Sequence, residues 1–449
     1  MEHAATLTSK PVGKTLLQLT IPMVAGMIGI VIFNLVDTYF VGLLGTDQLA
    51  AMSFTFPLVM IQGSISMGLG VGASAVVSRL IGQGNHNKVK RQATDSLLLA
   101  LIVVIILMFA GLFTITPVFT LLGAKGRVLV LAKEYMWIWY IGVPFLVIPM
   151  VGNNIIRASG NTVIPAAVML IAAGINAILD PLLIFGIGPF PALGLRGAAL
   201  ATVISRAGTL LAALYFLNFK FKMLAFKLPK FHEMLSSWKE MLFVGIPAAI
   251  TLLILPLSMA VVTRMVSGFG KEAVAAIGVG TRIEMFALSP IMALSAVFLP
   301  FVGQNLGAGR TDRIKEGMKI GPLFSLVFGA AIFVISLFGG RLIGRLFSQD
   351  HKVVELVYRY LAIVSGGYGL LGVMRINASV FNAIRRPFQS MALDLLRAFV
   401  LYVPLAYVFS VFLNVEGIFL GGLASSIIAG VVSWLWVTSS VDRLGMATR

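Results

Sequence analysis

The sequence predicts an all-α membrane protein that crosses the bilayer many times, and two observations carry this prediction. Of its 449 residues 59% are hydrophobic and 11% charged, with a mean hydropathy of +0.99, whereas an ordinary soluble domain is about 25% charged. Apolar runs recur from end to end, each long enough to cross a hydrocarbon core of about 30 Å, which takes about 20 helical residues. Because a chain in lipid satisfies its backbone hydrogen bonds internally, these runs should form helices.

Twelve transmembrane helices are expected, separated by short polar breaks. Their predicted ranges are 16–44, 50–80, 93–123, 132–156, 164–186, 197–218, 241–268, 274–304, 317–340, 355–381, 389–412 and 417–440. An even number places both termini on one side of the membrane. The terminal segments and even-numbered connections hold 20 Lys and Arg residues and the odd-numbered connections hold 8. The excess of basic residues predicts that both termini are cytoplasmic.

An internal repeat relates the two halves of the chain. One constant offset in residue number, which we call the repeat shift, places the loop IGQGNHNKVK on LGAGRTDRIK, with Gly84 on Gly309, and Tyr135 on Tyr360. Six helices repeated in order keep their orientation, which predicts parallel lobes that rock around a midplane site. We expect an N-terminal six-helix lobe at 1–217, a basic cytoplasmic linker at 218–240 and a C-terminal six-helix lobe at 241–449.

Two carboxylates interrupt the apolar spans of the first half. Asp37 lies in FNLVDTYFVG and Asp180 in NAILDPLLIFG, and the repeat shift places them on Val262 and Leu405. The duplicated fold therefore does not require either acid. A charged group at the bilayer centre costs about 2.5 to 3.5 kcal/mol on insertion scales and normally faces a cavity on an ion or proton path. The pair predicts a task that belongs to the first half alone.

Polar neighbours accompany both acids. Asn34 precedes Asp37 by three positions and Asn176 precedes Asp180 by four, so each pair shares one helix face. Thr202 lies on the sixth span. We expect one pocket between the first, fifth and sixth spans, where buried carboxyl groups favour their neutral form and exchange a proton or bind Na⁺. The alternative is a set of hydrogen-bonded structural acids.

Prolines within the spans suggest bends near these acids. Pro22 lies in the first span, and Pro181 directly follows Asp180. An interior proline removes a backbone hydrogen bond and kinks a helix. Pro22 is therefore a candidate hinge, although its match with Pro247 across the repeat also fits a static kink shared by both halves.

The second half has a different set of charged residues within its spans: Arg264, Arg282, Glu284, Arg375, Asp394 and Arg397. Asp394 and Arg397 are three positions apart, and we interpret them as a self-contained ion pair. Two functions of the whole set stay open, structural pairing and the lining of a cavity for an anion or a lipid headgroup.

Enzymatic and metal chemistry find no support. The chain has no cysteine, its four histidines lie in the terminal tail or the connections without ligand spacing, and it has no P-loop, HExxH or GxSxG motif. We expect no enzyme activity, no metal site and no cofactor besides the coupling ion. The net charge of +17 resides mostly in the breaks between spans, so nucleic acid is not an expected partner.

Several segments resemble the multidrug and toxic compound extrusion (MATE) family over essentially all twelve spans. They are IPMVAGMIGIVIFNLVDTYFVGLLGTDQLAA, SRLIGQGNHNKVKR, IRASGNTVIPA, NAILDPLLIFG, GTRIE and FVGQNLGAGRTDRIKE. The resemblance implies a monomeric antiporter of the bacterial inner membrane that exports amphipathic, often cationic compounds in exchange for H⁺ or Na⁺. The sequence looks most similar to the DinF-like branch, in which the acids of the first lobe carry coupling.

The resemblance also implies roles for particular residues. Asp37 would be the main protonation site, Asn176, Asp180 and Thr202 would surround it, and the first helix would bend near Pro22. The first-lobe cavity would be lined by Tyr135, Asn153 and Met169.

These expectations combine into alternating access with competition. A cationic substrate would occupy the first lobe while Asp37 and Asp180 are ionised, and their protonation would release it. Two other functions stay open. A flippase for lipid-linked oligosaccharides would need a cationic cavity containing Arg264, Arg282, Arg375 and Arg397. An ion channel or receptor is the other, although nothing resembles a selectivity filter.

Overall fold

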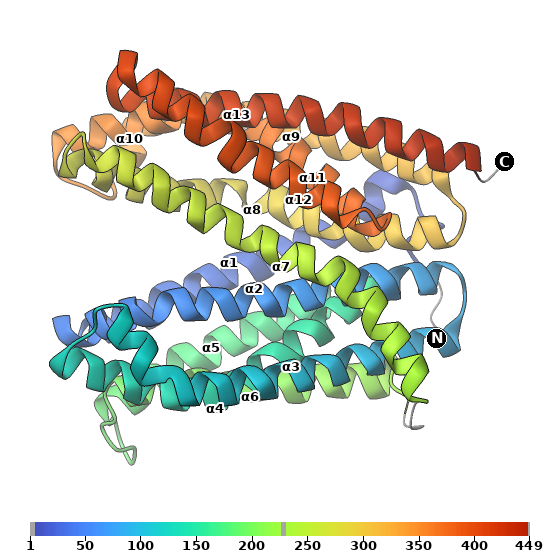
Figure 1. Cartoon of the computed structure of the whole chain (residues 1–449), viewed down its shortest axis with the longest axis horizontal. Coiled ribbons are helices and arrows are strands. Elements are labelled where there is room, and N and C mark those ends of the chain that lie inside the picture. The colour runs from blue at the N-terminus through green and yellow to red at the C-terminus, as the bar shows by residue number, and fades with distance from the viewer. Residues whose placement is uncertain (1–4, 226–229, 448–449) are drawn as a thin grey trace. The chain divides into compact units, whose positions relative to one another are not determined.

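The computed structural model describes residues 5–225 and 230–447, and within these ranges the secondary structure is helical (Figure 1). The α-helices are α1 (Val12–Gly42), α2 (Thr46–Gly82), α3 (His86–Leu121), α4 (Gly126–Ala158), α5 (Val163–Phe185), α6 (Leu195–Tyr215), α7 (Phe231–Ser267), α8 (Lys271–Gly307), α9 (Thr311–Arg345), α10 (His351–Val364), α11 (Tyr368–Ala383), α12 (Pro387–Leu395) and α13 (Val403–Ala447). The remaining elements are the π-helices η1 (Phe216–Lys220) and η3 (Leu396–Tyr402) and the 3₁₀-helix η2 (Ser365–Gly367).

Eleven helical segments of the described chain are long and apolar enough to cross a membrane. The last of them, Pro387–Arg443, has 57 residues, more than twice the length that one crossing needs. Its backbone leaves the helical conformation at Asn414 (φ 53°, ψ −137°), within α13. Figure 1 shows the chain folding back there, so this segment supplies the last two predicted spans. The predicted all-α polytopic class is confirmed.

The repeat appears in the backbone of corresponding turns. Gly84 has φ 72° in the first copy of the loop, and Gly309 has φ 70° in the second. Both glycine amides donate to the third carbonyl before them, at 3.0 and 3.2 Å. At another turn Gly160 has φ 89°, and Arg385, its counterpart under the repeat shift, has φ 62°. Since a side chain disfavours positive φ, the tertiary structure maintains the turn geometry even where the second copy has arginine in place of glycine.

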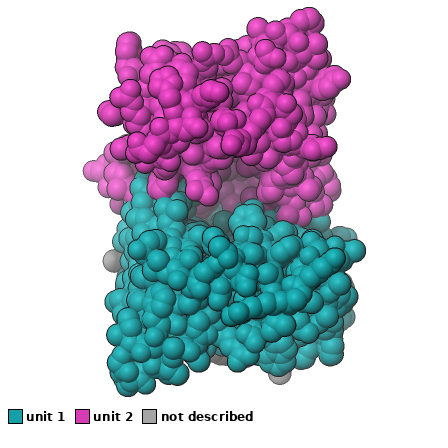
Figure 2. Space-filling model, turned by 90° about the vertical axis from the view of Figure 1, so that its left-hand side faces the viewer, with its two compact units in different colours: residues 1–5, 22–249 teal, residues 6–21, 250–449 magenta. Residues whose placement is uncertain are grey.

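Two compact units divide the chain (Figure 2). Unit 1 contains Ala5 and the described residues of 22–249, and unit 2 contains residues 6–21 and the described residues from 250 onward. The division cuts two helices. Helix α1 changes unit at Pro22, and α7 changes unit between Ala249 and Ile250, shortly after Pro247. The start of each repeat therefore packs with the opposite unit.

Unit 1 is a bundle in which α4 packs against α2, α3 and α6, and α5 packs against α6. Helix α1 lies along α5, because Gly29 leaves room for Leu170, whose Cδ2 lies 2.5 Å from where a Cβ would stand. Helix α1 also contacts α6, since the Arg206 guanidinium lies 5.0 Å from the centre of the Phe33 ring. These contacts bring the Asp37 segment of α1 against the helices that carry the other polar residues.

The described parts of the predicted linker are packed onto unit 1. The Trp238 indole donates to the carbonyl of Asp95 at 2.9 Å, and the amide of Ala225 donates to the Thr94 hydroxyl at 2.8 Å. Residues 226–229 of the linker lie outside the described residues. The chain then enters α7, which packs closely on α2: a Cβ on Gly72 would stand 2.3 Å from the carbonyl oxygen of Met241. Glycine in α2 thus allows this close approach of two helices.

In unit 2, helix α11 packs against α8, α9 and α13. The N-terminal segment of the chain is fixed where α8 passes to α9. The Arg313 guanidinium donates to the carbonyls of Leu7 and Lys10 at 3.2 and 2.5 Å, and to the Asn305 side chain at 3.0 Å. A buried guanidinium thus satisfies backbone acceptors in the segment just before α1.

Candidate functional site

Two buried carboxylates meet in unit 1. Asp37 on α1 is 6% exposed and Asp180 on α5 is fully buried. Their charges interact electrostatically, because α1 runs along α5. The Asn176 amide, one turn before Asp180, donates to Asp180 Oδ1 at 3.2 Å. The structure therefore places the two acids and one amide from the sequence-predicted set in one site.

The oxygen atoms of this site lack protein donors. Asp37 Oδ1, Asp180 Oδ2 and Asn176 Oδ1 are buried and accept no hydrogen bond from the described residues. The described lysines and arginines form no ion pair with either acid. Buried polar atoms are normally satisfied, and a proton on one carboxyl would turn an acceptor into a donor. The arrangement fits a group that exchanges a proton or binds a cation.

Helix α4 adds two polar side chains to the interior of unit 1. Tyr135 is 5% exposed, and its hydroxyl interacts electrostatically with both Asp37 and Asp180. Asn153 is also buried, and its side-chain oxygen accepts no hydrogen bond from the described residues. Tyr135 thus belongs to the carboxylate site.

Three other residues of the predicted set are not fully buried. Asn34 is exposed on α1, Thr202 is half-buried on α6 and Met169 is half-buried on α5. No described hydrogen bond joins Asn34 or Thr202 to the two carboxylates. Their proposed roles stay predictions. Pro22, the predicted hinge, is half-buried in α1 at the point where that helix changes unit.

Unit 2 contains a second cluster of buried charged and phenolic groups. The Tyr360 hydroxyl donates to Glu284 Oε2 at 2.6 Å, and Arg375 binds Asp394 at 2.7 Å. The interpretation of Asp394 and Arg397 as a self-contained pair is wrong, because the Asp394 carboxylate forms its ion pair with Arg375 of another helix. Arg264 and Arg282 are exposed.

Sequence reasoning missed the tyrosines of this second cluster. The hydroxyls of Tyr360, Tyr368 and Tyr402 each interact electrostatically with Glu284. The repeat contained the signal for one of them, since Tyr360 matches Tyr135 under the repeat shift. Each unit therefore places an equivalent tyrosine against an acid, buried in unit 1 and half-buried in unit 2.

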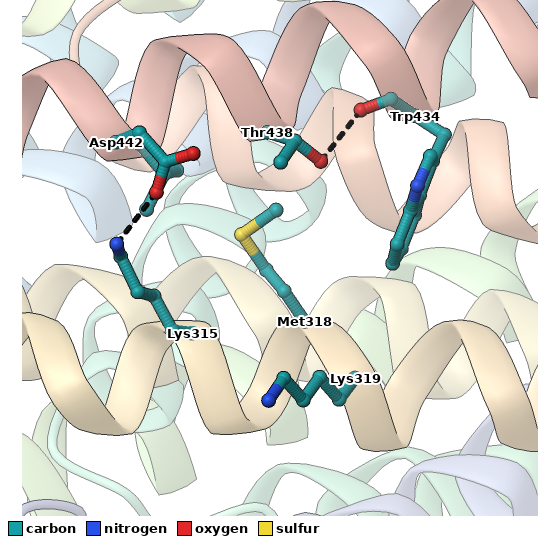
Figure 3. Close-up of a pocket in the computed structure, with 7 residues that line it drawn as sticks. Lys315, Met318, Lys319, Trp434, Thr438 and Asp442 are labelled. Atoms are coloured by element: carbon teal, nitrogen blue, oxygen red, sulfur yellow. Dashed lines mark hydrogen bonds and ion pairs between the residues drawn. The ribbon is translucent and has the colours of Figure 1, made fainter.

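A hollow of about 170 Å³ lies elsewhere in unit 2, between α9 and α13 (Figure 3). Lys315, Met318, Lys319 and Trp434 contribute to its lining, and Lys315 donates to Asp442 at 2.5 Å. The hollow contains none of the buried acids described above, and its Lys315–Asp442 pair is about half exposed.

Comparison with known proteins places these features in a family. The sequence model of the MatE family matches residues 22–182 and 247–408, two segments whose first residues, Pro22 and Pro247, correspond under the repeat shift. An FAD transporter of Shewanella oneidensis is 41% identical over 97% of this chain and 96% of its own length. The multidrug export protein MepA of Staphylococcus aureus is 28% identical over 98% and 96% of the two chains.

The fold is also that of solved transporters. The crystal structure of the Vibrio cholerae MATE transporter VcmN in the bent form superposes with a TM-score of 0.92 at 29% identity, covering 97% of this chain and 98% of the other. The two compared structures therefore agree over nearly their whole lengths.

Proposed function

The chain belongs to the MATE family of membrane transporters, and from that premise we propose that it exports FAD or a similar dinucleotide in exchange for protons. The coupling proposal rests on one observation: Asp37 and Asp180 are buried together without a cationic partner among the described residues. The substrate proposal rests on the 41% identical FAD transporter.

The electrostatics of a dinucleotide suit export from a cell that is negative inside. FAD carries a negatively charged pyrophosphate, so its exit and the entry of a proton both move charge down the membrane potential. Each elementary charge contributes about 2.3 kcal/mol per 100 mV. A tenfold substrate gradient costs only about 1.4 kcal/mol. One proton per substrate is sufficient under these conditions.

Direct competition between protons and substrate at the two acids cannot release an anionic substrate. Protonation removes negative charge from the site, and this would strengthen the binding of a phosphate there. We therefore propose that Asp37 and Asp180 act on the conformational equilibrium: protonation favours one state of α1, and the substrate binds the other. Pro22 is the proposed hinge, since α1 changes unit at this residue.

A second substrate class, amphipathic cationic drugs, is favoured by the same acids and by the 28% identical drug exporter. For a cation, ionised carboxylates attract and protonated ones release, so direct competition would suffice. Tyr135, Asn153 and Met169 would line that binding site, with Asn34 and Thr202 assisting the acids. Na⁺ in place of H⁺ is the corresponding alternative for the coupling ion.

The proposal includes an orientation and a division into moving parts. The distribution of basic residues supports cytoplasmic termini in a bacterial inner membrane. The lobes 1–217 and 241–449, joined by the linker 218–240, would rock during transport. A monomer of the DinF-like branch remains the proposed form.

Purified protein in sodium-free liposomes tests the function. Vesicles with an acidic lumen are given external FAD, and the trapped FAD is measured by its fluorescence after filtration. We expect uptake that disappears when the gradient is collapsed, and in Asp37→Asn falls to the rate of empty vesicles. Asp312→Asn is the matched control, since the Asp312 side chain is 65% exposed at the start of α9.

The outcomes separate the candidates. FAD uptake that survives in Asp37→Asn would show that Asp37 does not couple transport to protons. Uptake of ethidium but not of FAD would assign the drug function, and a requirement for Na⁺ would replace the coupling ion. Failure of both substrates, together with transfer of a labelled lipid between leaflets, would favour a flippase.

A further inference from the structure

We propose that Arg375 and Arg397 of unit 2 form a binding site for the phosphate groups of the exported molecule, here the pyrophosphate of a dinucleotide. This inference rests on the proposed function for the identity of the substrate. The presence of an anion site is argued from the cluster alone.

Two guanidinium groups lie close together in the interior of unit 2. The Arg397 side chain is 9% exposed, and the residue interacts electrostatically with Arg375. The Arg375 side chain is 18% exposed. Two cations brought together in a poorly solvated place repel each other and require anions to compensate them. Two acids, Asp394 and Glu284, lie in the same cluster, so the guanidinium donors that these acids leave free determine whether a further anion can bind.

The acids of the cluster occupy only some of the N–H donors of the two arginines. Asp394 is bound to Arg375 at 2.7 Å. Glu284 accepts the Tyr360 hydroxyl at 2.6 Å and forms no ion pair within the described residues. The hydrogen bond that Arg397 makes there is a long one, 3.5 Å from Nε to the Ser426 hydroxyl. A guanidinium has five N–H donors, so most of those on Arg397 remain available to a ligand.

A third observation is an unused hydroxyl beside this guanidinium. Tyr368 is 1% exposed, and its hydroxyl has no hydrogen-bond partner in the described chain. It interacts electrostatically with Arg397 and with Glu284. A phenolic O–H next to a guanidinium with free donors is a suitable combination for phosphate oxygens, which accept bidentate arginine contacts.

The backbone around Arg397 is also specialised. Arg397 lies in η3, and the Ser258 hydroxyl donates to the carbonyl of Ala398 at 3.0 Å. Single π-helical turns occur frequently at functional sites. Under the repeat shift Arg397 falls on Ala172 and Arg375 on Met150, so the repeated fold does not require either arginine. The arginines, like the acids of unit 1, belong to one half only.

A separate anion site would also explain how protonation can drive the export of an anion, although protonation of the acids would itself strengthen anion binding beside them. If the phosphates bind the arginines of unit 2, protonation of Asp37 and Asp180 does not have to repel or attract them directly. The flavin and the adenine remain free to contact other surfaces. Charge recognition and proton exchange are then assigned to different units.

Binding of ADP, which contains the diphosphate without the flavin, tests the inference directly. Full-length protein in phosphatidylcholine nanodiscs is titrated with ADP by calorimetry, and FAD, riboflavin and inorganic pyrophosphate are added as competitors. We expect FAD and pyrophosphate to displace ADP and riboflavin to have no effect. In Arg397→Gln the ADP affinity should fall by about tenfold or more, as expected for loss of a charge-assisted bidentate contact.

Two further variants separate binding from folding. Arg264→Gln removes an exposed arginine of the same unit and should leave ADP affinity unchanged. Arg397→Lys retains the charge without the planar fork and should recover only part of the affinity. Each variant is accepted for comparison when its thermal unfolding temperature matches that of the original protein.

The results decide among clear alternatives. Absence of ADP binding, or equal affinity in Arg397→Gln, would overturn the phosphate site. Arginine-dependent ADP binding without FAD transport would retain the site and reject the proposed function. If phosphatidylglycerol in the nanodiscs abolishes ADP binding, the site takes lipid headgroup phosphates and the dinucleotide assignment is wrong.

Discussion

Units 1 and 2 solve the same structural problem with opposite charges. Tyr135 in unit 1 and Tyr360 in unit 2 are equivalent across the repeat, and each interacts with an acid inside its unit. In unit 1 Asp37 and Asp180 have no cationic partner within the described chain, whereas in unit 2 the buried Asp394 is bound by Arg375. An acid without a cation can exchange a proton at small structural cost, but an acid that neutralises an arginine cannot.

The repeated fold, which both halves share, therefore depends on neither set of buried charges. The shared turns, the paired prolines and the exchanged helix starts belong to both halves. The buried acids of unit 1 and the arginines of the unit 2 cluster belong to one half each.

The largest difference should follow removal of one acid from each unit. Asp394→Asn leaves Arg375 without its carboxylate and should destabilise the protein by about 3 to 5 kcal/mol, the usual cost of breaking a buried pair. Asp180→Asn leaves no arginine unpaired, so the fold should persist while proton-driven transport is lost. Thermal unfolding and uptake are measured for both. Equal destabilisation by the two changes would contradict the contrast.

Close packing in unit 1 should give the next largest effect. A Cβ on Gly72 would stand 2.3 Å from a backbone carbonyl of α7, so Gly72→Ala should destabilise by about 1 to 3 kcal/mol, as overpacking does. Gly63→Ala on the same helix is the control, since nothing lies within 4 Å of its Cβ position. It should be neutral or slightly stabilising. An unchanged unfolding temperature in Gly72→Ala would mean that α2 and α7 can separate freely.

The two prolines should differ in their effect on transport. Pro22 precedes Asp37 on α1, whereas Val262 stands in the corresponding place on α7 after Pro247. If bending of α1 couples protonation to transport, Pro22→Ala should slow uptake several-fold, and Pro247→Ala should change it less. Initial rates at fixed pH gradient provide the comparison. A larger loss of uptake rate in Pro247→Ala than in Pro22→Ala would indicate that the hinge lies in the second half.

The smallest effect concerns the exposed pair in the hollow of Figure 3. The side chains of Lys315 and Asp442 are 48% and 49% exposed, and such ion pairs contribute about 0 to 1 kcal/mol. Lys315→Ala should therefore barely alter the unfolding temperature or FAD uptake. A strong loss of uptake would show that charges at this end of unit 2 also matter for transport.

The sequence determined the class of the protein and much of its first site. Composition and apolar runs were sufficient for the membrane helices, because lipid allows few other structures. The repeat shift, visible by inspection, reappears in the positive φ angles at Gly84 and Gly309. Asp37 and Asp180 could be identified in advance because a carboxylate in an apolar span is costly.

Packing between helices determines which charges become partners. Spacing along the chain assigned Asp394 to Arg397, but packing pairs it with Arg375 and leaves most Arg397 donors free. Packing also joins the start of α1 to unit 2 and the start of α7 to unit 1, although each helix begins the other repeat. These outcomes depend on contacts between helices distant in sequence, and helical periodicity specifies which face a residue occupies, not which helix that face meets.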